Sequence, residues 1–355
     1  MKKSDILGLC LLAFVIGCRF IMPLADFYAE SCYPYISAGL SRCASFVPFS
    51  LEEVVVIGFS VAFIVVLVTA IKRKEGFRRW FGKTARIAMW LVVWFYMGWG
   101  NNYYRTPLYS RLGIHRTTYD EETFIRFLKD YTKSLNAGAD AVVAWDKDEL
   151  EADVRDYYST EVAGFGYAAL RPWQHVKKPL LNPVYPAVGV LGYIGPFLCE
   201  AQLNLDIPDI EYPFHLAHEM AHLAGVTSEA EANYWAYEYC RRSDDMSVRY
   251  SGHLALLSYV AGSADYLLSD EESSTWVESL SDAVVKDYSE TYHYWEGKRV
   301  ALFDDIQYWM MDLFLRSNGV GEGAKDYSGV IGILMTMDEF GSSSRKEAAG
   351  ALAGE

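Results

Sequence analysis

Two histidines and a glutamate in the C-terminal half of the chain have the spacing of a metal-binding helix. The segment His218-Glu219-Met220-Ala221-His222 separates the histidines by four residues, so on a helix they lie on one face, one turn apart. Both rings can then reach one zinc ion at about 2.0–2.1 Å. Glu219 can take a proton from a zinc-activated water. The pattern predicts a hydrolytic centre with Zn²⁺ as its cofactor.

A catalytic zinc needs a third protein ligand and leaves its fourth position to water. Glu229 and Glu231 both follow the motif closely. Ser228 suits a helix N-cap, and Glu231 would then complete a capping box, so Glu229 is the preferred ligand and Glu231 the alternative. His215 precedes His222 by seven residues, which is about 10 Å along a helix and too far to share one ion. We expect His215 to be structural or to contact substrate.

The developing oxyanion of a hydrolysis reaction also needs a hydrogen-bond donor. Four side chains downstream of the motif are candidates, and the sequence favours none of them: Tyr250, His253, Tyr292 and His293. The segment Ala201–Leu205, just ahead of the motif, is a candidate edge strand that aligns an extended peptide by main-chain pairing.

The periodicity of apolar residues predicts the elements that carry this site. Pro213 and Gly225 frame a helix over 213–224, with the histidines in its middle. Gly, Pro and aromatic residues dominate 164–213, where short apolar runs at 187–194 and 201–207 predict strands. Further helices are expected at 120–136, 146–160, 229–242, 249–268, 273–293, 297–317 and 326–339. We expect the small, polar tail at 341–355 to be disordered.

Three apolar runs near the N-terminus predict transmembrane helices, at about 6–22, 54–71 and 87–104. The loop over 72–86 is rich in Lys and Arg, whereas the loop between the first two runs holds only Arg42. The positive-inside rule therefore places the N-terminus and the 72–86 loop in the cytoplasm and the C-terminal domain outside it. Trp80, Trp94, Trp99 and Tyr103 are candidates for the aromatic belts at the membrane surface. Cys18, after a basic and an apolar segment, offers an alternative as a lipoprotein signal.

Composition limits the function further. The first 100 residues hold 11 of the 32 basic residues and 6 of the 46 acidic ones, so the remainder is strongly acidic and is not expected to bind nucleic acid. Outside the cytoplasm, the pairs Cys32–Cys43 and Cys199–Cys240 could form disulfides or simply be buried thiols. The lipid bilayer and a peptide or protein substrate are the partners that the sequence predicts.

The motif, followed by Glu229-Ala230-Glu231-Ala232-Asn233, resembles the gluzincin metallopeptidases, in which a glutamate on a following helix is the third zinc ligand. It is similar to the prenyl-protein proteases and their bacterial heat-shock relatives, and that resemblance assigns the ligand to Glu229. Asn233 departs from their pattern, which has Asp there, and only six residues separate His222 from Glu229. In the metzincin pattern HExxHxxGxxH, Ser228 would occupy the ligand position, and serine is a poor zinc ligand.

The whole chain also resembles a bacterial family of uncharacterised multi-span membrane proteins with a C-terminal HExxH domain. That resemblance rests on five segments: Gly195-Pro196-Phe197, Pro213-Phe214, the HExxH helix, Glu229 to Asn233, and Arg249-Tyr250-Ser251-Gly252. It implies the architecture and the metal, but no substrate.

We therefore expect a multi-domain membrane protein. Residues 1–104 would form a three-helix anchor and 105–340 a mostly α, zincin-like domain with a small sheet. The expected function is that of a membrane-anchored zinc metallopeptidase acting outside the cytoplasm. The alternative is a non-catalytic zinc-binding sensor or scaffold, in which Glu231 or His253 closes the metal site as a fourth ligand. A cytoplasmic quality-control protease would require the opposite topology.

Overall fold

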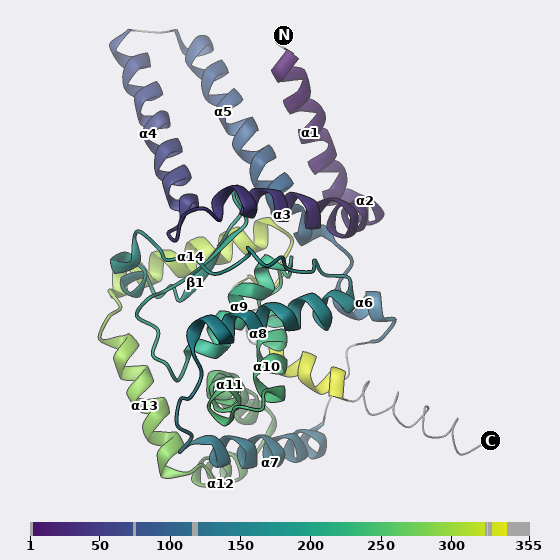
Figure 1. Ribbon diagram of the computed structural model, residues 1–355, viewed down its shortest axis with the longest axis vertical. Helices are drawn as coiled ribbons and strands as arrows, with labels where there is room; N and C mark the ends of the chain where they lie inside the picture. Colours follow the sequence, from purple (N-terminus) through teal and green to yellow (C-terminus); the bar gives the residue numbers. More distant parts are fainter. Residues whose placement is uncertain (1–2, 74–75, 116–119, 324, 326–328, 339–355) are drawn as a thin grey trace, which may run out of the picture.

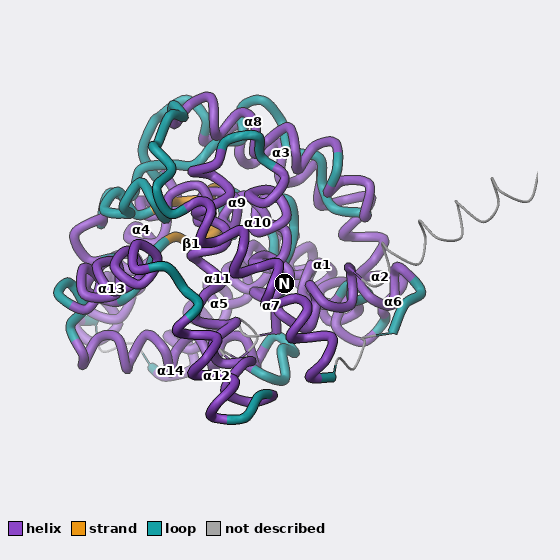
Figure 2. The backbone as a smooth tube through the Cα atoms, turned by 90° about the horizontal axis from the view of Figure 1, so that it is seen from below, coloured by secondary structure: helices purple, strands orange, loops and turns teal. Residues whose placement is uncertain are grey.

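The computed structural model of the chain describes residues 3–73, 76–115, 120–323, 325 and 329–338. It is mostly helical, with one small two-stranded sheet (Figures 1 and 2). The predicted tail at 341–355 lies outside the described residues. In chain order the main elements are α1 (Lys3–Phe20), α2 (Met22–Phe27), α3 (Tyr33–Ala44), α4 (Leu51–Lys72), α5 (Phe77–Gly98), α6 (Leu108–Leu112), α7 (Glu121–Gly138), α8 (Lys147–Thr160), β1 (Gly192–Gly195), β2 (Glu200–Leu203), α9 (Tyr212–Leu223), α10 (Glu229–Arg242), α11 (Met246–Leu267), α12 (Asp270–Glu278), α13 (Asp282–Glu296), α14 (Ala301–Ser317) and a last helix at 330–338.

Helices α1, α4 and α5 project together from the body of the molecule (Figure 1). Among the described residues, α4 is the one helix long and apolar enough by itself to cross a membrane, and few of its residues are buried. Helix α1 and the segment Met22–Ala44 are long and apolar enough only when they are taken together, and the chain bends by 116° between them. One or two segments could therefore span a membrane, and the third predicted span remains a prediction.

The predicted third span, 87–104, extends beyond the end of the helix that the structure has there. Helix α5 stops at Gly98, and residues 99–104 enter the body, where Gly100–Tyr104 form a 3₁₀ turn. Trp99 was expected in an aromatic belt, but its side chain is buried and its indole N–H donates to the carbonyl of His222 at 2.8 Å. The belt assignment of Trp99 is therefore wrong, because a buried carbonyl at the end of α9 takes its hydrogen bond.

Two further predictions need correction, and the structure distinguishes the two alternatives for the cysteines. The predicted helix over 273–293 is two helices, α12 and α13, because Ser281 caps a new helix by accepting a hydrogen bond from the Val284 N–H at 3.3 Å. The loop expected between the first two apolar runs contains α2 and α3. All six cysteines are free thiols, so neither proposed disulfide is present in the structure.

The two strands pair antiparallel, from Gly192 opposite Leu203 to Gly195 opposite Glu200. On its other side β2 contacts Lys177 through an isolated bridge to Gln202. Strand β2 is thus interior, with every residue buried, and β1 is the edge strand. The prediction that Ala201–Leu205 forms the edge strand is wrong, because the segment around Lys177 covers β2.

The base of α4 is joined to this sheet by buried carboxylates. The Glu52 side chain accepts hydrogen bonds from the N–H groups of Phe197 and Leu198, at 3.1 and 2.8 Å, between the two strands. Its own backbone N–H donates to Glu200 at 2.8 Å. Buried carboxyl groups need hydrogen-bond partners of this kind, and these bonds join the base of α4 to the sheet.

Helix α9 lies at the centre of the body, in contact with α8, α10, α11 and both strands. Its side chains Leu216, Met220 and Leu223 are almost completely buried. A helix that is apolar on most of its circumference must be enclosed by other elements. The predicted helices at 120–136, 146–160, 213–224 and 229–242 are confirmed within two residues at each end.

Candidate metal centre

Helix α9 begins and ends as its sequence predicts. Pro213 occupies the first turn, where its missing N–H costs no hydrogen bond. Gly225 follows the helix with a φ of 95°, a conformation that glycine adopts without steric cost. Between these residues His218 and His222 lie one turn apart, and both are buried.

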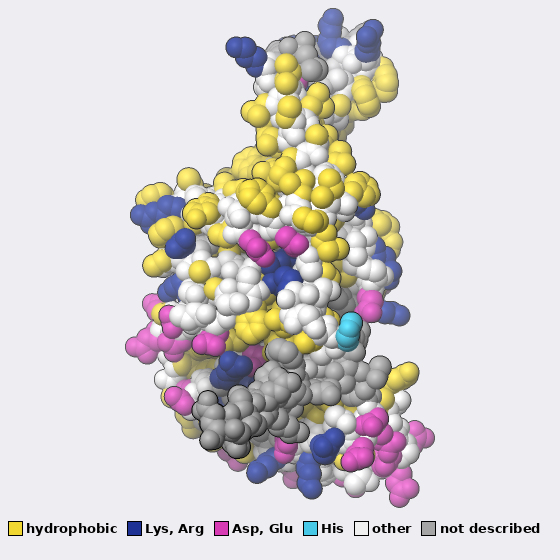
Figure 3. Space-filling view, turned by 90° about the vertical axis from the view of Figure 1, so that its right-hand side faces the viewer, with side chains coloured by type: hydrophobic (Ala, Val, Ile, Leu, Met, Phe, Trp, Pro, Cys, Tyr) yellow, Lys and Arg dark blue, Asp and Glu magenta, His cyan; other side chains and the backbone are white. Residues whose placement is uncertain are grey.

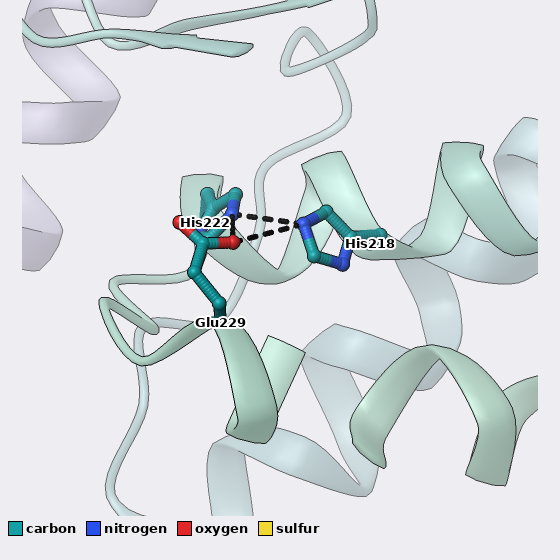
Figure 4. Close-up of side chains that lie close together, drawn as sticks. All are labelled: His218, His222 and Glu229. Atoms are coloured by element: carbon teal, nitrogen blue, oxygen red, sulfur yellow. Dashed lines mark hydrogen bonds and ion pairs between the residues drawn. The ribbon is translucent and has the colours of Figure 1, made fainter. Parts of the chain in front are cut away.

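His218, His222 and Glu229 converge on one point (Figure 4). The two histidine Nε2 atoms are 3.1 Å apart, and Oε2 of Glu229 lies 3.3 Å from each of them. Ligands at about 2.0–2.1 Å from a tetrahedral zinc are separated by about 3.3 Å. The three atoms therefore have the spacing that one such ion requires, and their two-nitrogen, one-oxygen chemistry suits zinc.

The structure distinguishes Glu229 from Glu231. Both lie in the first turn of α10, where the Ser228 side chain accepts the N–H of Glu231 at 3.2 Å. The Glu231 carboxylate accepts a hydrogen bond from the hydroxyl of Tyr167, and the guanidinium groups of Arg105 and Arg111 each lie 4.5 Å from the centre of the Tyr167 ring. Glu231 thus has a structural partner, and Glu229 is the glutamate that joins the histidines.

Hydrogen bonds from other parts of the chain orient α9 and its histidines. The second ring nitrogen of His222, Nδ1, lies 2.8 Å from the carbonyl of Val226, which favours a tautomer that leaves Nε2 available. Carbonyls of the helix accept from three aromatic side chains: Tyr33 to Leu223, Trp99 to His222 and Tyr158 to Ala217, each at 2.8 Å. Tyr33 and Trp99 come from the predicted anchor, so the anchor helps to hold the metal-binding helix.

These three donors could not be found from the sequence. Aromatic residues occur throughout the chain, which has 26 tyrosines and 10 tryptophans. Only their hydrogen bonds to carbonyls of α9 identify them.

Glu219 lies beside the three ligands and against the backbone of Gly192 in β1. A Cβ atom at Gly192 would lie 2.5 Å from Oε1 of Glu219. The carboxylate is buried, and its Oε2 has no hydrogen-bond partner among the described residues. Burial raises the pKa of Glu219 to about 7, although the two histidines oppose the shift. Such a carboxyl group can both accept and return a proton near neutral pH.

The ionisation of the ligands is coupled in the metal-free site. Burial opposes charge on His222, but Glu229 outweighs it and raises the pKa of His222 to about 9. Burial likewise opposes charge on Glu229, and the two histidines hold the pKa of its carboxyl well below the usual range. Glu229 is therefore ionised, as a metal ligand must be.

Two cavities meet at His218 and Glu219. One, of about 580 Å³, has almost entirely apolar walls, formed by the end of α5, by β1 and by one face of α14. The other, of about 1170 Å³, extends away from it between β1, α11 and α13 and has more polar walls, including Glu211, Tyr259 and Arg299. Glu219 faces both cavities, so a molecule lying along them would pass the metal ligands.

Most of the other predicted residues lie elsewhere. Both ring nitrogens of His253 have hydrogen-bond partners, the Tyr237 hydroxyl and the Arg249 carbonyl. The Tyr250 hydroxyl donates to Asp287 at 2.8 Å. His293 is exposed and pairs with Glu296 at 3.1 Å. His215 and Tyr292 line the more polar cavity without joining the ligand cluster, and burial lowers the pKa of His215 to about 3.

The structure adds Tyr259 as a candidate donor. Its side chain lines the same cavity as His218 and Glu219 and is hydrogen-bonded to Asn233. Burial raises the pKa of its hydroxyl, which therefore stays protonated and able to donate. Tyr259 lies 37 residues after His222 in the sequence, and nothing in its sequence context distinguishes it from the other tyrosines.

Comparisons with known proteins identify a family but no activity. A family model described as a protein of unknown function, DUF3810, matches residues 28–335. This range includes the metal-binding helix and most of the projecting helices. No curated protein and no solved structure matches the chain significantly.

Proposed function

The chain belongs to the DUF3810 family, whose function is unknown, and we propose that it is a membrane-anchored zinc metallopeptidase. The observation that carries the proposal is the convergence of His218, His222 and Glu229 on one point, with Glu219 beside them at the junction of two cavities. The residues resemble those of gluzincins in kind and order. A ligand cluster in a cleft large enough for an extended chain suits peptide hydrolysis better than a closed structural site.

Each side chain has a separate role in this proposal. His218, His222 and Glu229 would hold the zinc ion through the atoms that already face one another. Zinc would supply a Lewis acid and a water of lowered pKa. Glu219 would accept a proton from that water and return it to the departing amine, which its position and its access to both cavities permit.

The proposed anchor consists of α1, α4 and α5. Helix α4 has 22 residues, about 33 Å, which matches a hydrocarbon core of about 30 Å. Helix α5 starts with several basic residues, yet it packs against α1, where Arg86 pairs with Asp5 at 2.8 Å. Figure 3 shows hydrophobic side chains along the projecting helices and Lys and Arg at their far end. By the positive-inside rule that end is cytoplasmic and the metal centre lies outside.

The non-catalytic alternative requires a fourth protein ligand. Among the described residues, the ligand cluster comprises three side chains, and neither Glu231 nor His253 belongs to it. Both of these residues have other hydrogen-bond partners. This arrangement favours a catalytic ion, which keeps one position for water.

Elemental analysis of the detergent-purified chain tests the proposal, together with cleavage of a mixed library of quenched fluorescent peptides. We expect one zinc per chain in the wild type, in Glu219→Gln and in Glu231→Ala, and loss of zinc in Glu229→Ala. Peptide cleavage should require zinc and should be absent in Glu219→Gln. A wild-type chain without metal would refute the proposal, and full zinc without cleavage of any peptide, either free or carrying an apolar anchor, would favour the sensor or scaffold.

A further inference from the structure

Helix α14 is amphipathic, and its apolar side is exposed. Leu302, Ile306, Trp309 and Leu313 recur every three or four residues and are 66%, 46%, 64% and 53% exposed. Such spacing forms one continuous stripe along a helix. A patch of large apolar side chains on a protein surface marks a site of contact with another molecule or with a membrane.

The position of α14 indicates what covers this stripe. The helix runs crosswise to α4 and α5, at the level where they meet the body (Figures 1 and 2). Its C-terminal end is fixed to α5, because Tyr96 donates to Asn318 at 2.9 Å and Phe95 packs on Phe314. The C-terminal end of the apolar stripe thus lies beside the base of α5. A helix with this position and composition suits the boundary between lipid headgroups and acyl chains.

Helix α14 is also a wall of the apolar cavity beside the metal ligands. Phe303, Met310 and Phe314 line that cavity together with Ile306 of the stripe, Ile194 of β1 and Trp99. Phe303 and Met310 are half exposed as well, 49% and 58%. The same helix therefore borders both the proposed membrane surface and the cleft. The more polar cavity extends from the ligands in another direction, toward α11 and α13.

We infer that α14 lies in the headgroup boundary on the non-cytoplasmic side of the membrane. We also infer that the cleft takes the membrane-proximal segment of another membrane-anchored polypeptide. In this arrangement the apolar part of the substrate, next to its anchor, lies against α14. Its polar part continues through the second cavity. The inference rests on the proposed peptidase function and specifies its substrate class. A freely soluble peptide would gain nothing from the closeness of this cavity to the bilayer.

Photo-crosslinking tests the substrate class without needing cleavage. The full-length Glu219→Gln chain in proteoliposomes would carry p-benzoylphenylalanine at Gln307, which lines both cavities. A matched control would carry it at Val277, exposed on α12 far from the cleft. Three probes share one degenerate polar sequence: a free peptide, a peptide fused to a 20-residue oligo-leucine anchor, and the same fusion with a long Gly-Ser spacer. Mass spectrometry would locate each crosslink.

We expect crosslinks at position 307 with the directly anchored probe, within about ten residues of the anchor, which span about 33 Å when extended. The spacer probe controls for the concentration that anchoring alone confers. The spacer probe should give fewer crosslinks in its polar sequence, because its Gly-Ser segment then lies next to the anchor and opposite the cleft. Equal labelling of the free peptide, labelling independent of the spacer, or no labelling beyond that at position 277 would each overturn the inference.

The location of α14 has its own test. In vesicles of lipids brominated near the headgroup, wild-type fluorescence should be quenched more than that of Trp309→Phe, because Trp309 lies in contact with lipid. Equal quenching in both proteins would refute the membrane contact. If Trp309→Asp then also changed the oligomeric state, a second copy of the chain would be the occupant instead. The crosslinking and quenching measurements depend neither on zinc nor on cleavage. They can therefore contradict the substrate class while zinc binding and cleavage support the peptidase, or support it while zinc and cleavage are absent.

Discussion

The contact between Gly192 and Glu219 allows the proposed base to be moved without touching a metal ligand. A Cβ atom at Gly192 would lie 2.5 Å from Oε1 and 2.6 Å from Cγ and Cδ of Glu219. Carbon atoms in ordinary contact are about 3.5–4.0 Å apart. Gly192→Ala therefore requires the Glu219 side chain or the strand to shift by about 1 Å.

A displacement of this size has a predictable consequence. Misplacing a reacting group by about 1 Å can lower a rate about 100-fold, which corresponds to about 2.7 kcal/mol in the activation barrier. Zinc should be retained, because none of the three closest atoms to the new methyl group belongs to His218, His222 or Glu229. We thus expect kcat to fall about 100-fold in Gly192→Ala with one zinc still bound.

The assay combines elemental analysis with zinc-dependent cleavage of the quenched peptide library. Gly262→Ala is the matched control, because no atom lies within 4 Å of a Cβ at that position of α11. The control should retain both zinc and activity. Wild-type activity in Gly192→Ala would show that Glu219 need not lie where the structure has it. Loss of zinc would show that the strand, rather than the carboxylate alone, had moved.

Three further substitutions test the surroundings of the site. Trp99→Phe removes the hydrogen bond to the His222 carbonyl and should lower the free energy of unfolding by about 1–3 kcal/mol in a denaturation series. Tyr259→Phe should lower kcat about 100-fold without loss of zinc if its hydroxyl donates to the oxyanion, and unchanged kcat would exclude it. Glu211 is hydrogen-bonded to Trp295, and burial raises the pKa of its carboxyl from 4.5 to about 7. Folding therefore favours the protonated form, so this group stabilises the protein below about pH 4.5 relative to higher pH, and the contribution is lost as pH rises to about 7. Glu211→Gln should remove up to about 3 kcal/mol of that pH dependence, seen as a smaller fall in thermal stability between pH 5 and 8.

The local order of the metal-binding segment could be predicted because it depends on neighbours in the chain. Pro213 and Gly225 set the ends of one helix, and Ser228 sets the start of the next. Those short-range rules place the two histidines on one face. The capping position of Glu231 favours Glu229 as the third ligand, as the gluzincin resemblance does, and the Glu229 carboxylate lies beside both histidines.

Features that depend on long-range packing could not be predicted in the same way. Trp99 follows an apolar run and has the composition of a membrane-interface residue, but its partner, the His222 carbonyl, is 123 residues away. The edge strand was misassigned because Ala201–Leu205 alternates apolar and polar residues, as a half-buried strand does, whereas the segment that covers it, around Lys177, shows no strand periodicity. Tyr259 is likewise defined only by the cavity that it lines.

The short interval between His222 and Glu229 follows from where α10 begins. The chain reverses at Gly225, and α10 starts at Glu229 itself. The third ligand is thus the first residue of its helix, and it needs no additional helical turn before it reaches the histidines. A carboxylate at this position is also stabilised by the positive end of the helix dipole. Lengthening the connection would move Glu229 away from the start of α10 or away from the histidines, so the six-residue interval that departs from the gluzincin pattern is the one that this pair of helices requires.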